Sequence, residues 1–406
     1  MDPNRPISSR AFVRACLVVA LFAFVWPVSA LAAPFKTSGQ TTYKARRTVR
    51  GREFRIVSYN VQNLFKFRPN EADQRIQKRG ARRGRSAHYV PKSEADYRAK
   101  VDKLAAQIAK FGADVIALQE VENFKQFKGR DSALYDLVKA VERHTEAAGS
   151  KVTYRFTNSP GFSDIRGIAN AFLYRADRVR LANVTASHPI LGERSGDGQY
   201  TTRAGQKRTL NQGVWNPKSL NTIASESILG DKRGKFVFPR PVLVGAFEIF
   251  KDRVGEGPAE VVHVINNHLK SNPSEYKPRR KAQAAFNAKL VKDLTKANPE
   301  AKVMVAGDMN VDLNQASHRT QLGAIEALTP AKRGPNLLEN LTAKLDHKQT
   351  YVWDGAPQHL DWVYASPALA KTLVDITTPH INSPQPKDSR ASDHDPVITR
   401  FVGWGK

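Results

Sequence analysis

The sequence predicts an α/β fold. From Phe54 onward, short apolar runs recur between loops, and they are continuous rather than alternating between apolar and polar residues. Continuous runs of this length are typical of strands that are buried on both faces. Two longer segments with the spacing of amphipathic helices each lead into one of these runs. Helices followed by fully buried strands indicate a layered α/β architecture.

The first helix is expected to begin after Ser93 and to end before Gly112. Ser93 and Asp96 form a capping box, and Gly112 is a helix-stop residue. The second helix is expected to begin near Pro278. The apolar positions that should face the core are Tyr97, Val101, Leu104, Ile108 and Phe111 in the first helix, and Phe286, Leu290, Val291 and Leu294 in the second.

Polar residues that can carry chemistry fall at the ends of the predicted strands. These residues are Asn60 after "FRIVSY", Glu120 after "DVIALQ", His268 and Lys270 in "VVHVINNHLKS", Asp308 and Asn310 in "KVMVAGDMN", Asp361 in "HLDWVYAS", and Asp393 and His394 before "PVITRFV". Active sites gather at such strand ends. Carboxylate and amide oxygens suit a hard divalent cation such as Mg²⁺, whereas no cysteine cluster or His-x-x-x-His spacing indicates zinc.

Residues 1–32 are interpreted as a secretory signal peptide. Three arginines precede an uncharged run that ends in Ala30-Leu31-Ala32, which fits a small-residue cleavage rule. A membrane anchor is the alternative, because the run approaches spanning length, but Pro27 and the Ala-x-Ala motif favour removal after Ala32. A periplasmic or secreted protein is therefore expected. Its only cysteine, Cys16, leaves with the signal, so the mature chain forms no disulfide.

A single domain is expected over residues 54–406, preceded by a basic flexible leader at residues 33–53. Two long basic loops, residues 66–92 and 190–235, have almost no apolar periodicity. Long loops without secondary structure are either functional or disordered. A solvated loop and a contact with a phosphate backbone therefore both remain open for each of them.

The strongly basic composition points to polyanionic partners. Loss of the signal removes three arginines and one aspartate, which takes the formal net charge from +26 to +24. Such an excess favours association with nucleic acid, anionic lipid or envelope polymers. No stable protein partner is implied, and a monomer without an integral membrane segment is expected after signal removal.

Six motifs, in order, resemble the endonuclease/exonuclease/phosphatase superfamily. They are "SYNVQNLF", "DVIALQEVEN", "NNHLKS", "VAGDMNVD", "LDWVYAS" and "SDHDPV", and the resemblance extends from about Phe54 to Val402. In detail they are most similar to the motifs of secreted bacterial nucleases. The resemblance implies a four-layer α/β sandwich, in which two mixed β-sheets lie face to face, flanked by helices, with the site at one end.

The same resemblance implies a metal-dependent phosphodiesterase. Glu120 would be the main metal ligand, with Asn60 and Asp393 contributing directly or through water. Mg²⁺ is the expected ion, with Mn²⁺ or Ca²⁺ as alternatives. Where some relatives place an acid two residues after the first asparagine, this chain has Gln62, which weakens or shifts metal coordination.

Five residues are implied to act on the phosphodiester itself. His394 would be the general base for water, and Asp361 would orient its imidazole and stabilise the protonated form. Asp308 would position water or a proton, and Asn310 would donate its amide to a phosphoryl oxygen. His268 would assist departure of the leaving oxygen.

Three further residues are candidates for substrate contact: Arg166, Asn170 and Lys270. The carboxylate that pairs with the leaving-group histidine in deoxyribonuclease-like relatives has no clear counterpart, because Ser159 stands at the nearest position. Asp164 would have to substitute, or His268 goes unpaired.

The leading hypothesis is therefore a secreted, Mg²⁺-dependent nuclease that acts on DNA, with RNA as a second candidate substrate. A phospholipid or inositol-phosphate phosphoesterase, such as a sphingomyelinase relative, is the alternative, because it would use the same residues. A protein that binds polyanions without catalysis is a third class, against which the complete set from Asn60 to His394 argues.

Overall fold

A computed structural model gives the fold. It describes residues 40–45, 52–71, 74, 90–123, 127–159, 164, 166–191, 199–201, 207–209, 214–215, 237–272, 274–330 and 334–404. The expected signal peptide and most of both basic loops lie outside these residues. Within the described ranges, no helix combines the length and apolar character needed to cross a membrane.

Two large mixed sheets form the centre of the molecule. The first contains, in spatial order, β1 (Thr41–Lys44), β17 (Leu373–Thr378), β18 (Val397–Gly403), β2 (Arg52–Leu64), β3 (Val115–Glu122), β5 (Ile168–Arg175) and β4 (Tyr154–Asn158). The second contains β13 (Glu339–Asn340), β16 (Asp361–Ala365), β12 (Lys302–Asp308), β11 (Ala259–His268), β10 (Leu243–Phe250) and β6 (Val179–Leu181), with β9 (Val214–Trp215) also paired to β10. In each sheet one central pair is parallel, β2 with β3 and β11 with β12.

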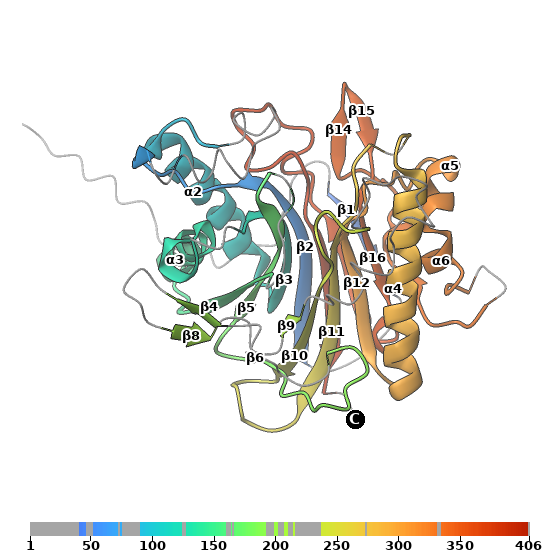
Figure 1. Cartoon of the computed structure of the whole chain (residues 1–406). Helices are drawn as coiled ribbons and strands as arrows, with labels where there is room; N and C mark the ends of the chain where they lie inside the picture. Colours follow the sequence, from blue (N-terminus) through green and yellow to red (C-terminus); the bar gives the residue numbers. More distant parts are fainter. Residues whose placement is uncertain are drawn as a thin grey trace, which may run out of the picture.

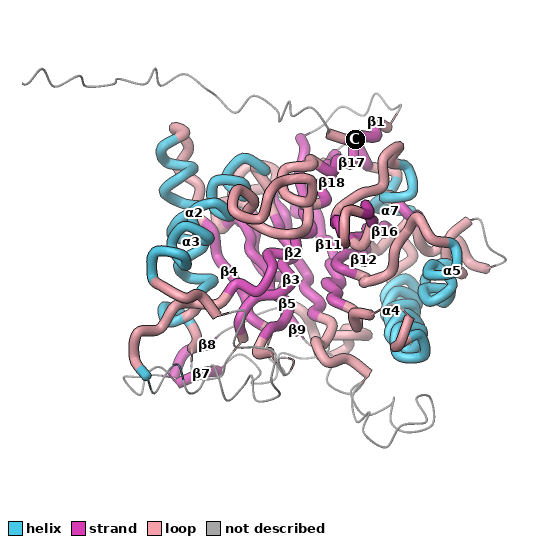
Figure 2. The backbone as a smooth tube through the Cα atoms, turned by 90° about the horizontal axis from the view of Figure 1, so that it is seen from above, coloured by secondary structure: helices cyan, strands magenta, loops and turns pink. Residues whose placement is uncertain are grey.

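Helices cover the outer face of each sheet (Figures 1 and 2). On the first sheet these are α2 (Glu94–Phe111) and α3 (Ala133–Ala147); on the second they are α4 (Lys277–Ala297), α5 (Ala316–Arg319) and α6 (Gly323–Glu326). One apolar core lies under α2 and α3, a second fills the space between the sheets, and a third lies under α4 and α6. A short helix, α7 (Pro367–Ala370), follows β16. The expected four-layer α/β sandwich is confirmed.

Both predicted helices form as the sequence indicated. The Ser93 side chain accepts a hydrogen bond from the backbone N–H of Asp96, and Gly112 ends α2 in the left-handed conformation, with φ of 56°. The predicted apolar faces of α2 and α4 are buried. Helix α3 was not among the predicted elements; its N-cap is Ser132, whose hydroxyl accepts from the N–H of Tyr135.

Two expectations about irregular segments need correction. Residues 41–44 were expected in a flexible leader, but they form β1, which pairs with β17 at the edge of the first sheet. The loop at 190–235 contains three short strands, β9 and the pair β7 (Gln199–Thr201) and β8 (Lys207–Thr209). Backbone pairing with distant strands, rather than an apolar pattern, holds β1 and β9 in place.

Gly307, next to Asp308 in β12, provides a test of this packing. Its φ is +133°, and a Cβ atom there would lie 2.0 Å from the carbonyl oxygen of Asn267 on β11. We expect Gly307→Ala to lower the free energy of unfolding by about 3 kcal/mol or more, because backbone atoms of both strands must move. Urea denaturation measures this difference.

Gly323→Ala is the matched control, because a Cβ at Gly323 meets nothing within 4 Å. It should leave stability unchanged or raise it slightly, since alanine favours helix. Equal stability of the two variants would contradict the strand pairing described here.

Candidate active site

The polar residues of the six motifs meet at one end of the sandwich, between the two sheets. On the second sheet, His268 ends β11, Asp308 ends β12 and Asp361 begins β16, and the register pairs Asp308 with both of the others. From the first sheet come Glu120 in β3 and His394 just before β18. Strands far apart in the sequence therefore bring the motif residues to one place.

These side chains border an open cleft of about 450 Å³. The residues that line it are Gln62, Asn63, Glu120, Arg166, His268, Ser271, Asn272, Ser274, Asp308, Asn310, Tyr351, Trp353, Gln358, Leu360, Asp393 and His394. Most of the lining residues are polar, and two, Tyr351 and Trp353, carry large aromatic rings. A polar cleft with converging acids and imidazoles is the usual form of a hydrolytic site.

Unfavourable backbone conformations concentrate around this cleft. Seven described non-glycine residues have positive φ, and five of them line the cleft: Gln62, Asn63, Glu120, Asn272 and Asn310. A left-handed conformation at such a residue costs of order 1–3 kcal/mol and persists only where the surroundings enforce it. Strain of this kind marks functional sites.

Glu120 owes its position to an irregularity in the first sheet. Its φ is 63°, and the regular pairing of β3 with β2 and with β5 shifts around it. One carboxylate oxygen accepts the backbone N–H of Asn63 at 2.9 Å. The other lies 3.6 Å from His268 Nε2 and 3.9 Å from Arg166 Nη2. The irregularity thus aims the carboxylate into the cleft.

Asp308 connects the two sheets at the floor of the site. Its Oδ2 accepts the side-chain amide of Asn60, on the first sheet, at 3.1 Å, and its Oδ1 accepts the backbone N–H of Asn310 at 2.8 Å. Oδ2 also lies 3.4 Å from His268 Nε2 and 3.9 Å from His394 Nε2. Burial raises the pKa of Asp308 to about 7, although the charge of His394 opposes the increase.

His394 is held by Asp361, as expected from the resemblance. Its Nδ1 lies 2.8 Å from Asp361 Oδ2, which leaves Nε2 directed toward Asp308 and the cleft. The Tyr351 ring packs against the imidazole with 4.8 Å between centroids. Burial would lower the pKa of His394, but the carboxylates of Asp361 and Asp308 outweigh it and hold that pKa well above the usual range. His394 therefore carries a proton in the free site.

The pKa of His268 is shifted in the opposite direction from that of His394. Burial lowers its pKa well below the usual range, and the positive charges of Arg240 and Arg166 lower it further, so the imidazole is neutral. Within the described part of the chain, His268 Nδ1 has no hydrogen-bond partner. Asp164 does not substitute for the missing carboxylate, because it pairs with Arg166 and Arg240, each at 3.2 Å.

The structure separates the three candidates for substrate contact. Arg166 lines the cleft and donates to Asn63 Oδ1 at 3.3 Å. Asn170 was expected at the substrate, but it is 1% exposed and donates to the carbonyls of Pro241 and Asn266 between the sheets. Lys270 was also expected there, but its amine lies over the Tyr276 ring, 4.0 Å from the centroid, outside the cleft lining. The expectation of substrate contact was therefore wrong for Asn170 and for Lys270.

Asn60 and Asn310 hold more structural contacts than the sequence indicated. Asn60 is fully buried, its amide nitrogen donates to Asp308 and its oxygen accepts the N–H of Gln62 at 3.0 Å. The Asn310 amide donates to the carbonyl of Leu269 at 3.1 Å while the residue lines the cleft. Gln62 also lines the cleft, and its carbonyl accepts from the buried amine of Lys100.

Several cleft residues were missed by the sequence analysis. They are Asn63, Ser271, Asn272, Ser274, Tyr351, Trp353, Gln358 and Leu360. Asn63 lies inside the quoted motif "SYNVQNLF" and Leu360 begins "LDWVYAS", so proximity to a motif was the available signal for these two residues. Ser271 is the last residue of "NNHLKS", and Asn272 and Ser274 follow it in the loop before α4.

The donor set fits a divalent cation that is held by few protein ligands. In the described ranges, no three Asp, Glu, His or Cys side chains already surround one point as a metal cluster. Mg²⁺ is usually bound through one or two carboxylates together with water and phosphate oxygens. Glu120 and Asp393 both line the cleft, and burial followed by the negative charge of Glu120 raises the pKa of Asp393, although His394 opposes this. A cation between these carboxylates would relieve their repulsion.

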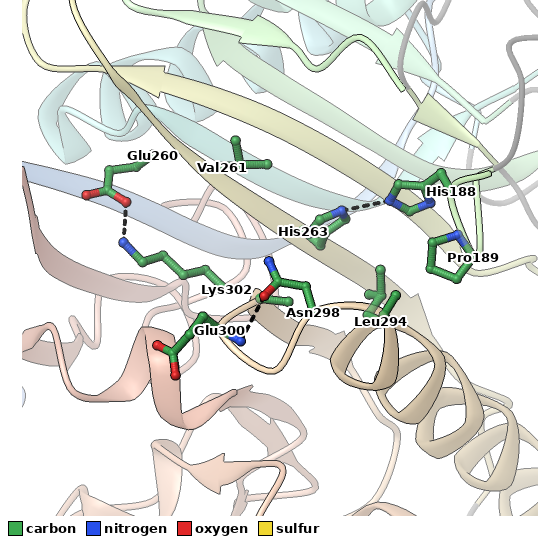
Figure 3. A pocket seen from close by; sticks show the side chains of 11 residues that line it. His188, Pro189, Glu260, Val261, His263, Leu294, Asn298, Glu300 and Lys302 are labelled. Atoms are coloured by element: carbon green, nitrogen blue, oxygen red, sulfur yellow. Dashed lines mark hydrogen bonds and ion pairs between the residues drawn. The ribbon is translucent and has the colours of Figure 1, made fainter. Parts of the chain in front are cut away.

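A second cavity of about 390 Å³ lies on the outer face of the second sheet (Figure 3). There, the Nε2 atoms of His188 and His263 lie 3.0 Å apart, and Glu260 forms an ion pair with Lys302. Burial lowers the pKa of His263 to about 4, so this imidazole is neutral. Glu260 and His263 precede His268 along β11 by several residues, and the cavity shares no lining residue with the cleft.

A sequence model of the Endonuclease/Exonuclease/phosphatase family matches residues 57–394. The chain therefore belongs to this family. Its members are hydrolases that act on phosphoester bonds and generally use divalent metal ions. No match was found among curated proteins.

Solved structures with a similar fold come from animals and bacteria. The human nocturnin catalytic domain, determined with a bound sulfate anion, has a TM-score of 0.50 and 11% identity, with 89% of this chain and 96% of that one covered. A truncated TDP2 from Caenorhabditis elegans has a TM-score of 0.45 and 16% identity, with 86% and 98% covered. An endonuclease/exonuclease/phosphatase protein from Bacteroides vulgatus has a TM-score of 0.47 and 12% identity, with 86% and 99% covered. The nocturnin likeness supports the fold.

The pairing of Asp361 with His394 can be tested without any assay of activity. In Asp361→Asn, the loss of the carboxylate charge should lower the pKa of His394, because Asp361 is the strongest of the groups that raise it. Titration of the imidazole signals by NMR, in chelator, measures the change, and His394→Gln assigns the signal. Asp354→Asn, at an exposed position, should leave it unaltered. An unchanged His394 pKa in Asp361→Asn would refute the pairing.

Proposed function

We propose that this protein is an exported, Mg²⁺-dependent nuclease that hydrolyses phosphodiester bonds in nucleic acid, DNA first and RNA second. One observation carries the proposal. The carboxylate of Glu120 faces an imidazole–carboxylate array, made of His268, Asp308, His394 and Asp361, across a single cleft.

In the proposed reaction, water attacks phosphorus and the ester oxygen opposite it departs. In its ionised form Asp308 accepts the proton of the attacking water at Oδ2. The protonated His394, whose Nε2 lies 3.9 Å from that oxygen, orients the water, while Asp361 fixes its ring from the other side. His268, neutral and close to both Glu120 and Asp308, donates a hydrogen bond to the departing oxygen, which takes its proton from solvent. The products are a phosphomonoester and an alcohol.

The remaining residues bind and orient the phosphate. Asn310 and Arg166 lie in the cleft lining and present an amide and a guanidinium to phosphoryl oxygens. A divalent cation bound by Glu120, with Asp393 and the buried Asn60 as the other candidate ligands, would neutralise phosphate charge. Little covalent work is needed in such a displacement, so positioning and charge neutralisation lower most of the barrier.

The charge of the chain supports nucleic acid as the substrate. The formal net charge, +26 for the whole chain and +24 without residues 1–32, would attract a polyanion and raise its local concentration at the cleft. The apolar segment within residues 1–32 supports export, and the absence of cysteine after Cys16 leaves the exported chain without disulfides.

His394→Ala should lower turnover on DNA at least about a hundredfold while DNA binding is retained, because the group that orients the attacking water beside Asp308 is lost. Nuclease assays and fluorescence anisotropy measure the two quantities. His347→Ala, at an exposed histidine, is the control and should be fully active. Near-normal turnover of His394→Ala would refute the role.

The metal requirement forms a separate test. Chelator should abolish hydrolysis and added Mg²⁺ restore it, and Glu120→Gln should require at least about tenfold more Mg²⁺ for half-maximal activity, since a ligand charge is lost. Calorimetric titration with Mg²⁺ gives the affinity directly. Glu146→Gln, on the exposed surface of α3, should behave as the wild type. Unaltered Mg²⁺ affinity in Glu120→Gln would exclude Glu120 as a ligand.

A further inference from the structure

A small hairpin beside the cleft belongs to neither large sheet. It consists of β14 (Tyr351–Trp353) and β15 (Ala356–Gln358), and it projects from the site end of the molecule (Figure 1). Its turn residues, Asp354 and Gly355, have φ of 47° and 75°, which is the two-residue turn that closes tight hairpins. The hairpin is thus a compact unit.

The base of this hairpin is fixed to the residues of the site. Thr350 is fully buried, and its hydroxyl accepts the backbone N–H of Leu360 at 3.0 Å and of Asp361 at 3.2 Å. Its carbonyl accepts the N–H of Asp395 at 2.8 Å. Tyr351 forms a β-bridge with His394. The hairpin therefore keeps a constant position relative to Asp361 and His394.

Trp353, at the end of β14, is 64% exposed although it lines the cleft. Among the described residues, Val261 is the other large apolar side chain with high exposure, at 43%, and it borders the second cavity. Tryptophan is highly buried on average, because its ring has a large apolar area. An indole held in solvent at the rim of a site has no packing role there, so its exposure needs another explanation.

The two aromatic residues of β14 lead away from His394. Tyr351 packs on His394, and Trp353 follows two residues later on the same face of the strand, about 6.6 Å further at about 3.3 Å per residue. The cleft lining also includes hydrogen-bonding groups such as Arg166 and Asn272. A chain that places a phosphate at His394 would therefore place the adjoining nucleotide beside Trp353.

We infer that Trp353 stacks on the nucleobase next to the scissile phosphate, and that the substrate is accordingly single-stranded nucleic acid or a single-stranded end. This inference rests on the proposed nuclease function. Aromatic side chains stack on unpaired bases without sequence preference. Inside a duplex both faces of a base are covered by its neighbours, so a base on Trp353 has left the stack. Asp354 beside Trp353 is exposed, and a charge at the tip opposes insertion into lipid.

The experiment is a cycle that combines removal of the ring with removal of the base. The substrates are single-stranded oligonucleotides with one cleavable phosphodiester, flanked either by thymidines or by abasic sugars. Trp353→Ala should lower kcat/KM about tenfold on the thymidine substrate and leave it unchanged on the abasic one. Trp353→Phe, which keeps a ring, should retain most of the rate. On duplex DNA the wild type should be slower than on the single strand.

Controls separate stacking from folding and from the nuclease function itself. Trp353→Ala should unfold at the wild-type temperature, because the ring is exposed, and Val261→Ala should cleave both substrates at the wild-type rate. An equal loss on the thymidine and abasic substrates would overturn the inference. If the wild type cleaves no oligonucleotide, the proposed nuclease function is wrong. If it cleaves them but Trp353→Ala changes kcat/KM equally with and without the base, only the stacking of Trp353 on the base is wrong.

Discussion

The structure of the site depends on polar contacts that fix the two sheets against each other. Asn60 on β2 donates to Asp308 on β12. Beneath it, Gln119 on β3 donates to Asn266 on β11 at 2.8 Å, and Asn266 in turn donates to backbone carbonyls of the first sheet. Buried amides require partners, so the sheets cannot slide without leaving them unsatisfied. The distance between His394 and His268, which come from opposite sheets, follows from this alignment.

The sequence predicted the fold where the signal was local. Helix α2 carries its cap, its apolar face and its stop residue within one segment, and all three are found in the structure. The apolar spacing of α3 and the capping hydroxyl of Ser132 were equally present, so that omission was avoidable. Strand β1 could not be predicted from the sequence, because "TTYK" has no apolar pattern. It is held by pairing with residues 375–378 at the other end of the chain.

The sequence predicted which residues meet at the site, but it did not predict the direction of every side chain. The residues at strand ends converge, because the ends of neighbouring strands share one edge of a sheet. Asn170 and Lys270 were misplaced because the direction of a side chain depends on which strands pair and where a turn begins, and sequence spacing does not contain that information. The position of Trp353 depends on the anchoring of Thr350 beside Asp361, which is a tertiary contact.

The five left-handed residues around the cleft have a consequence for the evolution of this chain. Glycine would adopt the same backbone at no steric penalty, and yet each position keeps a side chain. Backbone strain is therefore concentrated at the cleft rather than spread over the fold. Selection for heat resistance alone should favour glycine at the most strained of these positions, whereas selection for turnover should preserve the side chains that line the cleft.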